Sequence, residues 1–173
     1  KPNGKATKKV ENTTRNDGIT NVQDVLKYSI HVTNEQTNST WTNAKMTDVL
    51  PKGVTFDKAK ANVQVNGKVV DKYSYDEKTR KLEVELGNIE GGKTTGEGKD
   101  QKDITFLVTV NDDALETTVT NVAKVSGSNG TDVTTPGGKE SSVAVTKGKP
   151  NGKATKKVEN TTRNDGITNV QDV

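Results

Sequence analysis

The chain contains no cysteine, so disulfide bonds cannot stabilise it. Hydrophobic residues make up 28% of its 173 positions and aromatic residues 3%, which is little for a helical bundle. A β-sandwich remains possible, because only alternate residues of its strands face inward. No apolar run approaches the length of a membrane-spanning helix, so we expect no membrane insertion.

Histidine and clustered basic charge are scarce as well. The single histidine, His31, has no cysteine or second histidine with which to form a zinc site, and we expect it to be solvated. The 26 basic and 23 acidic residues are interspersed, without a basic stripe that could bind nucleic acid. We therefore expect no cofactor, no metal and no nucleic-acid partner. Nothing in the sequence suggests an enzyme that turns over a substrate.

A long exact repeat is present. Residues 1–25 and 149–173 share one sequence, KPNGKATKKVENTTRNDGITNVQDV, at an offset of 148 positions (149 − 1). This spacing is the size of an ordinary domain. We predict one complete module at 1–148, a linker at 147–152, and the first strand and loop of the next, truncated copy at 149–173.

Alternation of apolar and polar residues dominates the module and predicts β-strands. The apolar positions of the main strands, in chain order, are Ala6 and Val10; Leu26, Tyr28, Ile30 and Val32; Ala44, Met46 and Leu50; Leu82, Val84 and Leu86; Ile104, Phe106, Val108 and Val110; Val119, Ala123 and Val125; and Val143 and Val145. Asn66-Gly67 between short apolar stretches predicts a tight hairpin. We expect a long loop at 91–102 and one helical turn at 112–116. These features predict an all-β, antiparallel, immunoglobulin-like sandwich of nine or ten strands.

Three polar side chains interrupt these apolar faces: Lys8, Asp48 and Asn121. Burial of an unpaired charge costs several kcal/mol, so the three groups must satisfy one another or lose their charges. Alternatives are that Lys8 extends to solvent, that Asp48 caps the turn at Pro51, or that Asn121 bonds to a neighbouring strand.

Mutual burial would have a chemical consequence. Desolvation lowers the pKa of a lysine and raises that of an aspartate, so a buried pair can exist as neutral amine and neutral acid. A neutral Lys8 amine could attack the Asn121 amide, with Asp48 donating a hydrogen bond to the amide oxygen and acting as proton shuttle. The product is a Lys–Asn isopeptide bond, with release of ammonia. Alternation favours Lys8 over Lys9, which should face solvent.

The motifs around these residues resemble a known group of proteins. The chain is similar to the isopeptide-forming fimbrial and collagen-adhesin A-type domains, and to a related surface-protein repeat. Four stretches carry this resemblance: Lys8-Lys9-Val10, Tyr28 to Asn34, Thr47 to Phe56 and Asn121 to Val125. The resemblance spans roughly residues 5–146. It implies a stalk on the surface or cell wall of a bacterium, usually a Gram-positive one. The insertion at 91–102 and the second lysine, Lys9, depart from the pattern.

The function that we expect is structural: a spacer repeated along a surface adhesin or fibre, with neighbouring identical repeats as its partners. Two alternatives are a repeat held by packing alone and an adhesive module for host matrix or glycans. The sequence shows no aromatic cluster or groove that would favour adhesion. A third alternative is a strand-exchanged fibre, in which Lys156, the equivalent of Lys8, reaches Asn121 of the preceding module.

Two further candidate sites are weaker. Asp112, Asp113 and Glu116 match no calcium-loop spacing, and a local turn explains them. Trp41, the only tryptophan, could contact a ligand, but a core anchor is the better expectation.

Overall fold

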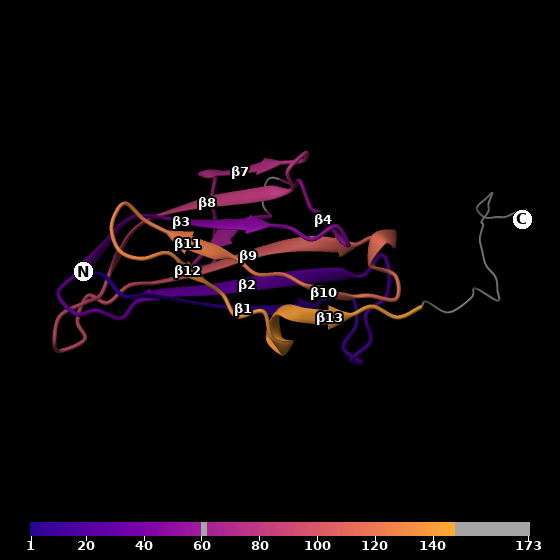
Figure 1. The fold of residues 1–173 in the computed structure, drawn as a ribbon, viewed down its shortest axis with the longest axis horizontal. Coiled ribbons are helices and arrows are strands. Elements are labelled where there is room, and N and C mark those ends of the chain that lie inside the picture. Colours follow the sequence, from indigo (N-terminus) through magenta and orange to yellow (C-terminus); the bar gives the residue numbers. More distant parts are fainter. Residues whose placement is uncertain (60–61, 148–173) are drawn as a thin grey trace, which may run out of the picture.

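The computed structural model describes residues 1–59 and 62–147 (Figure 1). The regular secondary structure of this part of the chain consists of strands and two single 3₁₀ turns. The strands are β1 (Gly4–Asn12), β2 (Val25–Asn34), β3 (Thr40–Val49), β4 (Val54–Phe56), β5 (Gln64–Val65), β6 (Lys68–Val69), β7 (Tyr73–Asp76), β8 (Lys81–Glu90), β9 (Gln101–Val110), β10 (Thr118–Thr120), β11 (Lys124–Ser126), β12 (Val133–Thr134) and β13 (Ser142–Ala144). The turns are η1 (Asp112–Ala114) and η2 (Lys139–Ser141).

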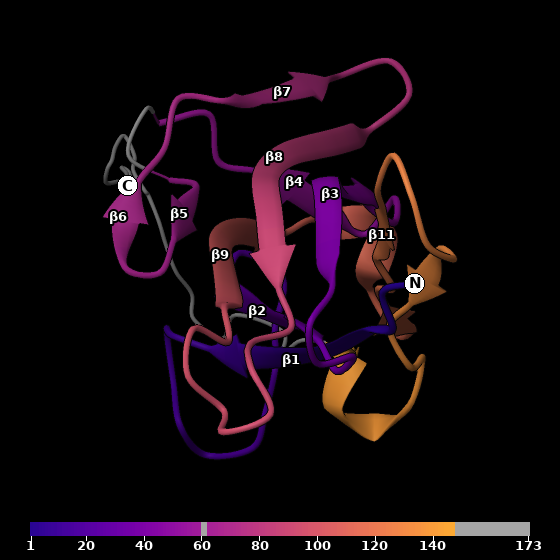
Figure 2. The same cartoon turned by 90° about the vertical axis from the view of Figure 1, so that its left-hand side faces the viewer.

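Two antiparallel sheets enclose the core. The first has the strand order β1-β2-β9-β5-β6, with β4 also paired to β9. The second has the order β12-β11-β3-β8-β7, and β10 and β13 form a separate two-stranded ribbon. The end-on view shows β8, β3 and β11 on one side and β9, β2 and β1 on the other (Figure 2). This confirms the predicted all-β antiparallel sandwich.

The alternation of apolar and polar residues in the sequence matches the alternation of buried and exposed side chains in the structure. In β2 and β9 every second side chain enters the core, and the core contains apolar residues from both sheets. Because a one-residue slip would turn these faces toward water, the pattern fixes the register of each strand. The hairpin at Asn66-Gly67 is confirmed as well, with positive φ angles of 53° and 78° that a tight two-residue turn requires.

Two sequence expectations need correction. The expected continuous strand from Val119 to Val125 is divided: β10 pairs with β13, whereas β11 pairs with β3 and β12, and residues 121–123 cross between them. Such divisions raise the strand count above the predicted nine or ten. The expected loop at 91–102 ends earlier, because Gln101 and Lys102 pair with Thr33 and Val32 as the start of β9. The helical turn expected at 112–116 is confirmed as η1.

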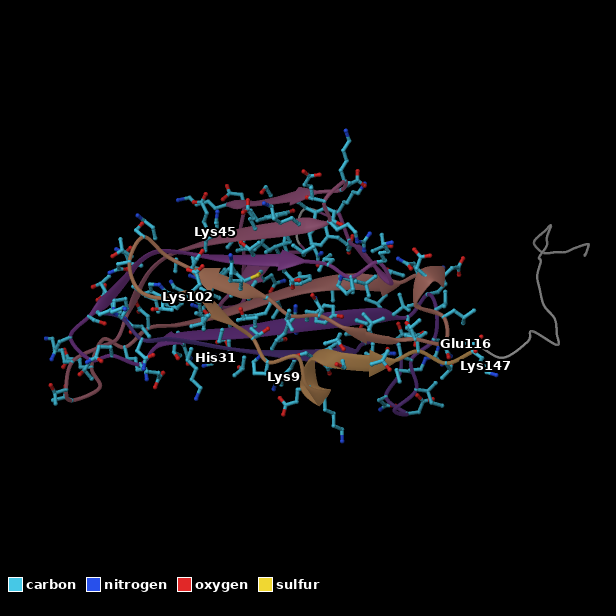
Figure 3. The ribbon with its side chains drawn as sticks, viewed as in Figure 1. Lys9, His31, Lys45, Lys102, Glu116 and Lys147 are labelled. Atoms are coloured by element: carbon cyan, nitrogen blue, oxygen red, sulfur yellow. The ribbon has the colours of Figure 1, made fainter. Side chains whose placement is uncertain are left out.

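The two ends of the module lie at opposite ends of its long axis. The N-terminus lies at one end in Figure 1, and Lys147 lies at the other in Figure 3. A bridge between Thr20 and Val145 fixes the end of the module beside the connection from β1 to β2. The second copy, 149–173, lies outside the described residues, so the domain division stays a prediction.

Candidate cross-linking site

Lys8, Asp48 and Asn121 meet in the interior. All three are buried, with exposed fractions of 2%, 0% and 1%. Lys8 Nζ donates a hydrogen bond to Asp48 Oδ2, and Asn121 Nδ2 donates to the same oxygen at 3.1 Å. Because both nitrogens contact one atom, they lie within two hydrogen-bond lengths, about 6 Å, of each other. The structure therefore brings together the three residues that the sequence singles out.

Each of the three residues comes from a different part of the sandwich. Lys8 lies on β1, opposite Ile30 of the first sheet, and Asp48 lies near the end of β3, opposite Leu82 of the second. Asn121 follows β10, where the chain crosses toward the second sheet. Its backbone N–H donates to Ser141 O at 3.1 Å, which ties this crossing to η2. A bond from Lys8 to Asn121 would fasten the edge strand of one sheet to the segment that enters the other.

Aromatic rings surround the amine. Lys8 Nζ lies 4.7 Å from the ring centroid of Tyr28 on β2 and 6.0 Å from that of Phe106 on β9. The Tyr28 and Phe106 rings are 5.6 Å apart, and Phe106 continues the cluster to Phe56 at 6.2 Å. Such rings exclude water and still offer the amine a favourable electrostatic face. The sequence marks Tyr28 and Phe106 as core residues but does not show that they frame the site.

The dry surroundings shift both ionisable groups toward their neutral forms. Burial lowers the pKa of Lys8 to about 8, although the neighbouring Asp48 opposes this shift. Burial likewise raises the pKa of Asp48, against the opposing effect of Lys8. Asp24, also buried, behaves in the opposite way: its hydrogen bonds with Arg15 lower its pKa to about 2. Desolvation therefore outweighs charge pairing at both groups, which favours the neutral acid and the neutral amine over the charged pair.

The orientation of the amide differs from the expected one. The sequence-based hypothesis has Asp48 donating to the amide oxygen of Asn121, but in the structure the amide nitrogen faces Asp48 Oδ2. Asp48 Oδ2 thus contacts the amine that would attack and the nitrogen that would leave. This position suits transfer of a proton from one nitrogen to the other.

The alternative placements of Lys8 and Asp48 are wrong, whereas Asn121 does bond to a neighbouring strand, through Asp48 of β3. The Lys8 side chain is fully buried and does not extend to solvent. Asp48 does not cap the turn at Pro51. That turn is held instead by Arg80, which donates to the carbonyl oxygens of Leu50, Pro51 and Val54. Lys9, as expected, is exposed on the outer surface of β1 (Figure 3).

The remaining candidate residues take no part in the site. His31 is exposed and pairs with Asp103 at 2.6 Å, and Trp41 is fully buried, as expected of a core anchor. Asp112 and Asp113 form the first turn of η1. Residues 1–59 and 62–147 contain no cluster of three or more possible metal ligands among histidine, cysteine and acidic side chains. Within the same ranges no helix is long and apolar enough to cross a membrane.

Comparison with known proteins gives a fold. No family model matches the sequence, and no curated protein matches it. Solved structures do match. The chain is similar to the major pilin BcpA of Bacillus cereus, with a TM-score of 0.55 and 16% identity over 83% of this chain and 40% of that one. It is similar to domains D2 and D3 of the major pilin SpaD of Corynebacterium diphtheriae, with a TM-score of 0.53 and 22% identity over 76% and 50%.

A third match is the major pilin SpaA of Corynebacterium diphtheriae, with a TM-score of 0.51 and 22% identity over 73% of this chain and 32% of that one. The chain has a pilin fold. It spans half or less of the length of each of these pilins, so it corresponds to a part of them. At these identities the likeness is one of fold, and the pilin fold confirms the immunoglobulin-like sandwich predicted from the sequence.

Proposed function

We propose that this pilin-fold module is a structural spacer of a bacterial surface fibre or adhesin, stabilised by an isopeptide bond between Lys8 and Asn121. The observation that supports the proposal is the contact of both side-chain nitrogens with Asp48 Oδ2 in a site closed to water. SpaA, whose fold is similar, is described as pointing to a modular pilus assembly with stabilising isopeptide bonds. Position on the outer surface of a Gram-positive cell follows from the same likeness and belongs to this proposal.

The reaction needs only groups that are present. The neutral Lys8 Nζ attacks Asn121 Cγ, and a new C–N bond forms. Protonated Asp48 delivers its proton to Asn121 Nδ2 and takes one from Nζ, the Cγ–Nδ2 bond breaks, and ammonia leaves. Asp48 ends in the protonation state in which it began, so it serves as a proton shuttle. The reaction occurs once per molecule, which distinguishes it from turnover by an enzyme.

The bond would stabilise the module considerably. It closes a loop between positions 113 residues apart (121 − 8). By analogy with a disulfide of that loop length, constraint of the unfolded chain contributes about 4–5 kcal/mol. A protein without cysteine gains in this way a covalent closure that reducing conditions cannot reverse.

Intact mass tests the proposal directly. The purified chain should weigh one ammonia less than its translated sequence. Lys8→Ala, Asn121→Ala and Asp48→Ala should each restore the full mass, since they remove the nucleophile, the electrophile and the proton shuttle. Asp48→Ala should do so with little change in the fold, because the cavity that it leaves is small.

Lys9→Ala is the matched control. Lys9 is the adjacent lysine on the same strand, but its side chain is exposed, so this variant should still lose ammonia. Retention of ammonia by the wild-type protein would contradict the cross-link, and the module would then be held by packing alone.

An adhesive function gains one specific observation. The sequence suggests no aromatic cluster or groove, and the structure shows both. A groove of about 850 Å³ lies beside β6 and β7, and its lining residues are Phe56, Lys58, Val69, Val70, Asp71, Tyr73, Ser74, Tyr75 and Glu77. Half-buried tyrosines beside polar groups form a surface on which a sugar ring can stack.

Immobilised host matrix proteins and glycans provide the test of adhesion. A binding module should capture one of these ligands, and Tyr75→Ala should abolish the capture while the loss of ammonia continues. A spacer should bind none of them.

A further inference from the structure

Three buried polar atoms at the cross-linking site have no hydrogen-bond partner. Within the part of the chain that the structure describes, Asn121 Oδ1, Asp48 Oδ1 and the Tyr28 hydroxyl each lack one. The Asp48 Oδ2 contact involves the amide nitrogen, so it leaves the amide oxygen unsatisfied. A buried polar atom without a partner is costly and requires an explanation, and a catalytic role is one such explanation.

Tyr28 lies within the same cluster as the amide. It is fully buried on β2, and Lys8 Nζ lies 4.7 Å above its ring. Burial and the neighbouring Asp48 raise the pKa of Tyr28, and the Asn121 side chain is close enough to lower it in part. The hydroxyl therefore keeps its proton at neutral pH and lies close to the amide, although no hydrogen bond joins them in this structure.

The attack on the amide creates a need for such a donor. When Lys8 Nζ adds to Asn121 Cγ, the electron pair of the C=O bond moves to Oδ1, which gains negative charge in a site without water. Asp48 Oδ2 contacts the amide nitrogen, and no hydrogen bond from Asp48 reaches the amide oxygen in this structure. Donors aimed at a developing oxyanion are among the largest contributions to catalysis of acyl transfer.

We propose that the Tyr28 hydroxyl donates a hydrogen bond to Asn121 Oδ1 as Lys8 attacks, and so stabilises the tetrahedral intermediate. This inference rests on the proposed cross-link. The Tyr28 proton stays on its oxygen: as the Cγ–Nδ2 bond breaks and ammonia leaves, the electron pair returns from Oδ1 and the carbonyl of the isopeptide re-forms. Asp48 and Tyr28 thus divide the work, one at the nitrogens and the other at the oxygen.

A purely structural role predicts a different outcome. If only the ring of Tyr28 mattered, phenylalanine would replace it fully. Phe106, its partner on the adjacent strand β9, already contributes such a ring to the core. The buried hydroxyl would then only destabilise the core, and its removal would leave the rate of cross-linking unchanged. Tyr28→Phe separates the two roles, because it removes the oxygen and keeps the ring.

The experiment follows the loss of ammonia over time in the full chain. The protein is synthesised in a cell-free reaction, portions are quenched in acid, and intact mass gives the linked fraction. We expect Tyr28→Phe to form the bond roughly 100-fold more slowly than wild type, the size of effect that loss of one oxyanion donor produces. Tyr75→Phe, which also removes one tyrosine hydroxyl, should match wild type.

A second measurement tests whether Tyr28→Phe slows cross-linking by destabilising the fold. In the Lys8→Ala background, where no bond can form, the protein with Tyr28→Phe should have the same melting temperature as the protein with tyrosine at position 28, or a higher one. A slow reaction with an intact fold would support the donor role. Equal rates for wild type, Tyr28→Phe and Tyr75→Phe would overturn it, as would slow linking that follows a lower melting temperature. If wild type itself never loses ammonia, the cross-link fails, which is a different result.

Discussion

Lys8 occupies a buried position where a charged lysine destabilises the fold. Its neighbours on the inner face of β1 are apolar, and the rings of Tyr28 and Phe106 cover its amine. The strand cannot shift to expose it, because a slip would turn the whole apolar face outward. The site therefore disfavours the charge, and the lowered pKa increases the fraction of Lys8 that is a neutral, nucleophilic amine.

Before the bond forms, the stability of the module should depend on pH in a specific way. The pKa of Lys8 falls from 10.5 to about 8 on folding, so between these values the unfolded chain holds more protons than the folded one. Stability should therefore rise with pH across this window, by at most about 3 kcal/mol, and the penalty should be complete below pH 8. Asn121→Ala, which keeps the amine but cannot link, is the protein to measure by urea unfolding.

Lys8→Met combined with Asn121→Ala supplies the control for that titration, because it removes the ionisable group and keeps a side chain of similar length. The difference in unfolding free energy between the two proteins should grow from pH 8 to 10.5. A difference that stays constant would show that Lys8 keeps its ordinary pKa.

At this scale the sequence predicts which residues meet, but not how they are oriented. The alternation of Ala6, Lys8 and Val10 distinguishes Lys8 from Lys9, and the structure agrees. The direction of the Asn121 amide and the approach of Tyr28 depend on side-chain rotation and on strands far apart in the chain. Strand periodicity contains no information about either.

Among the elements, β1 is held at its first residue by a close contact. A Cβ at Gly4 would lie 2.4 Å from the ring carbons of Trp41, so the indole packs directly on the glycine. Gly127 and Gly130 also approach the indole, which explains why a large buried residue is surrounded by small ones. Trp41 thus anchors β1 to β3, and with it the strand that bears Lys8.

Gly4→Ala should therefore destabilise the module. Overpacking of a close contact costs typically 1–3 kcal/mol, and we expect a loss in that range when urea unfolding is measured in the Lys8→Ala background. Gly138→Ala is the control, because no atom lies within 4 Å of its Cβ position and its φ of −91° suits any residue. Equal stabilities of the two variants would mean that Trp41 moves aside freely.

The elements show where sequence patterns stop being informative. The hairpin at Asn66-Gly67 is predictable because its two positive φ angles demand those residue types. The break between β10 and β11 is not, because Val119, Asn121, Ala123 and Val125 continue to alternate across it. Alternation reports which face is buried, but it does not report which strand is the partner.

In the whole molecule, the length of chain limits strand exchange. Val145 bridges to Thr20, whose hydroxyl lies 3.4 Å from the Asn12 side chain at the far end of β1. For the second copy to replace β1 in register, Gly152 would have to reach the position of Gly4, eight residue steps or about 27 Å back along the strand. Seven steps from Val145 provide at most about 25 Å before any sideways path. The connection is therefore too short for the second copy to replace the whole of β1 within one chain, and we expect Lys8 to supply the amine.

Lys156→Ala should consequently have no effect on the cross-link. This variant should lose ammonia as wild type does, whereas Lys8→Ala should keep its full mass although Lys156 is present. Loss of ammonia in Lys8→Ala would show that the second copy supplies the nucleophile. Its dependence on protein concentration would then show whether a neighbouring chain donates the strand.

The cross-link also determines how the molecule bears force, because the two ends of the module lie at opposite ends of its long axis (Figure 1). Tension that enters at the N-terminus reaches Lys8 after seven residues. With the bond in place it passes directly to Asn121, and the 112 residues from 9 to 120 (120 − 8) bear none. Only residues 1–7 and the segment after Asn121, which contains β11, β12 and β13, can still be drawn out.

Stretching of single molecules tethered at their two ends should make this visible. The wild-type module should extend by about 390 Å less than Lys8→Ala, the contour length of 112 residues at about 3.5 Å each. Lys9→Ala should extend like wild type, since it keeps the bond. Equal extension of wild type and Lys8→Ala would show that force passes through the strands alone. A spacer that resists shear requires the shorter extension, because the bond keeps β2 to β10 folded while the fibre is pulled.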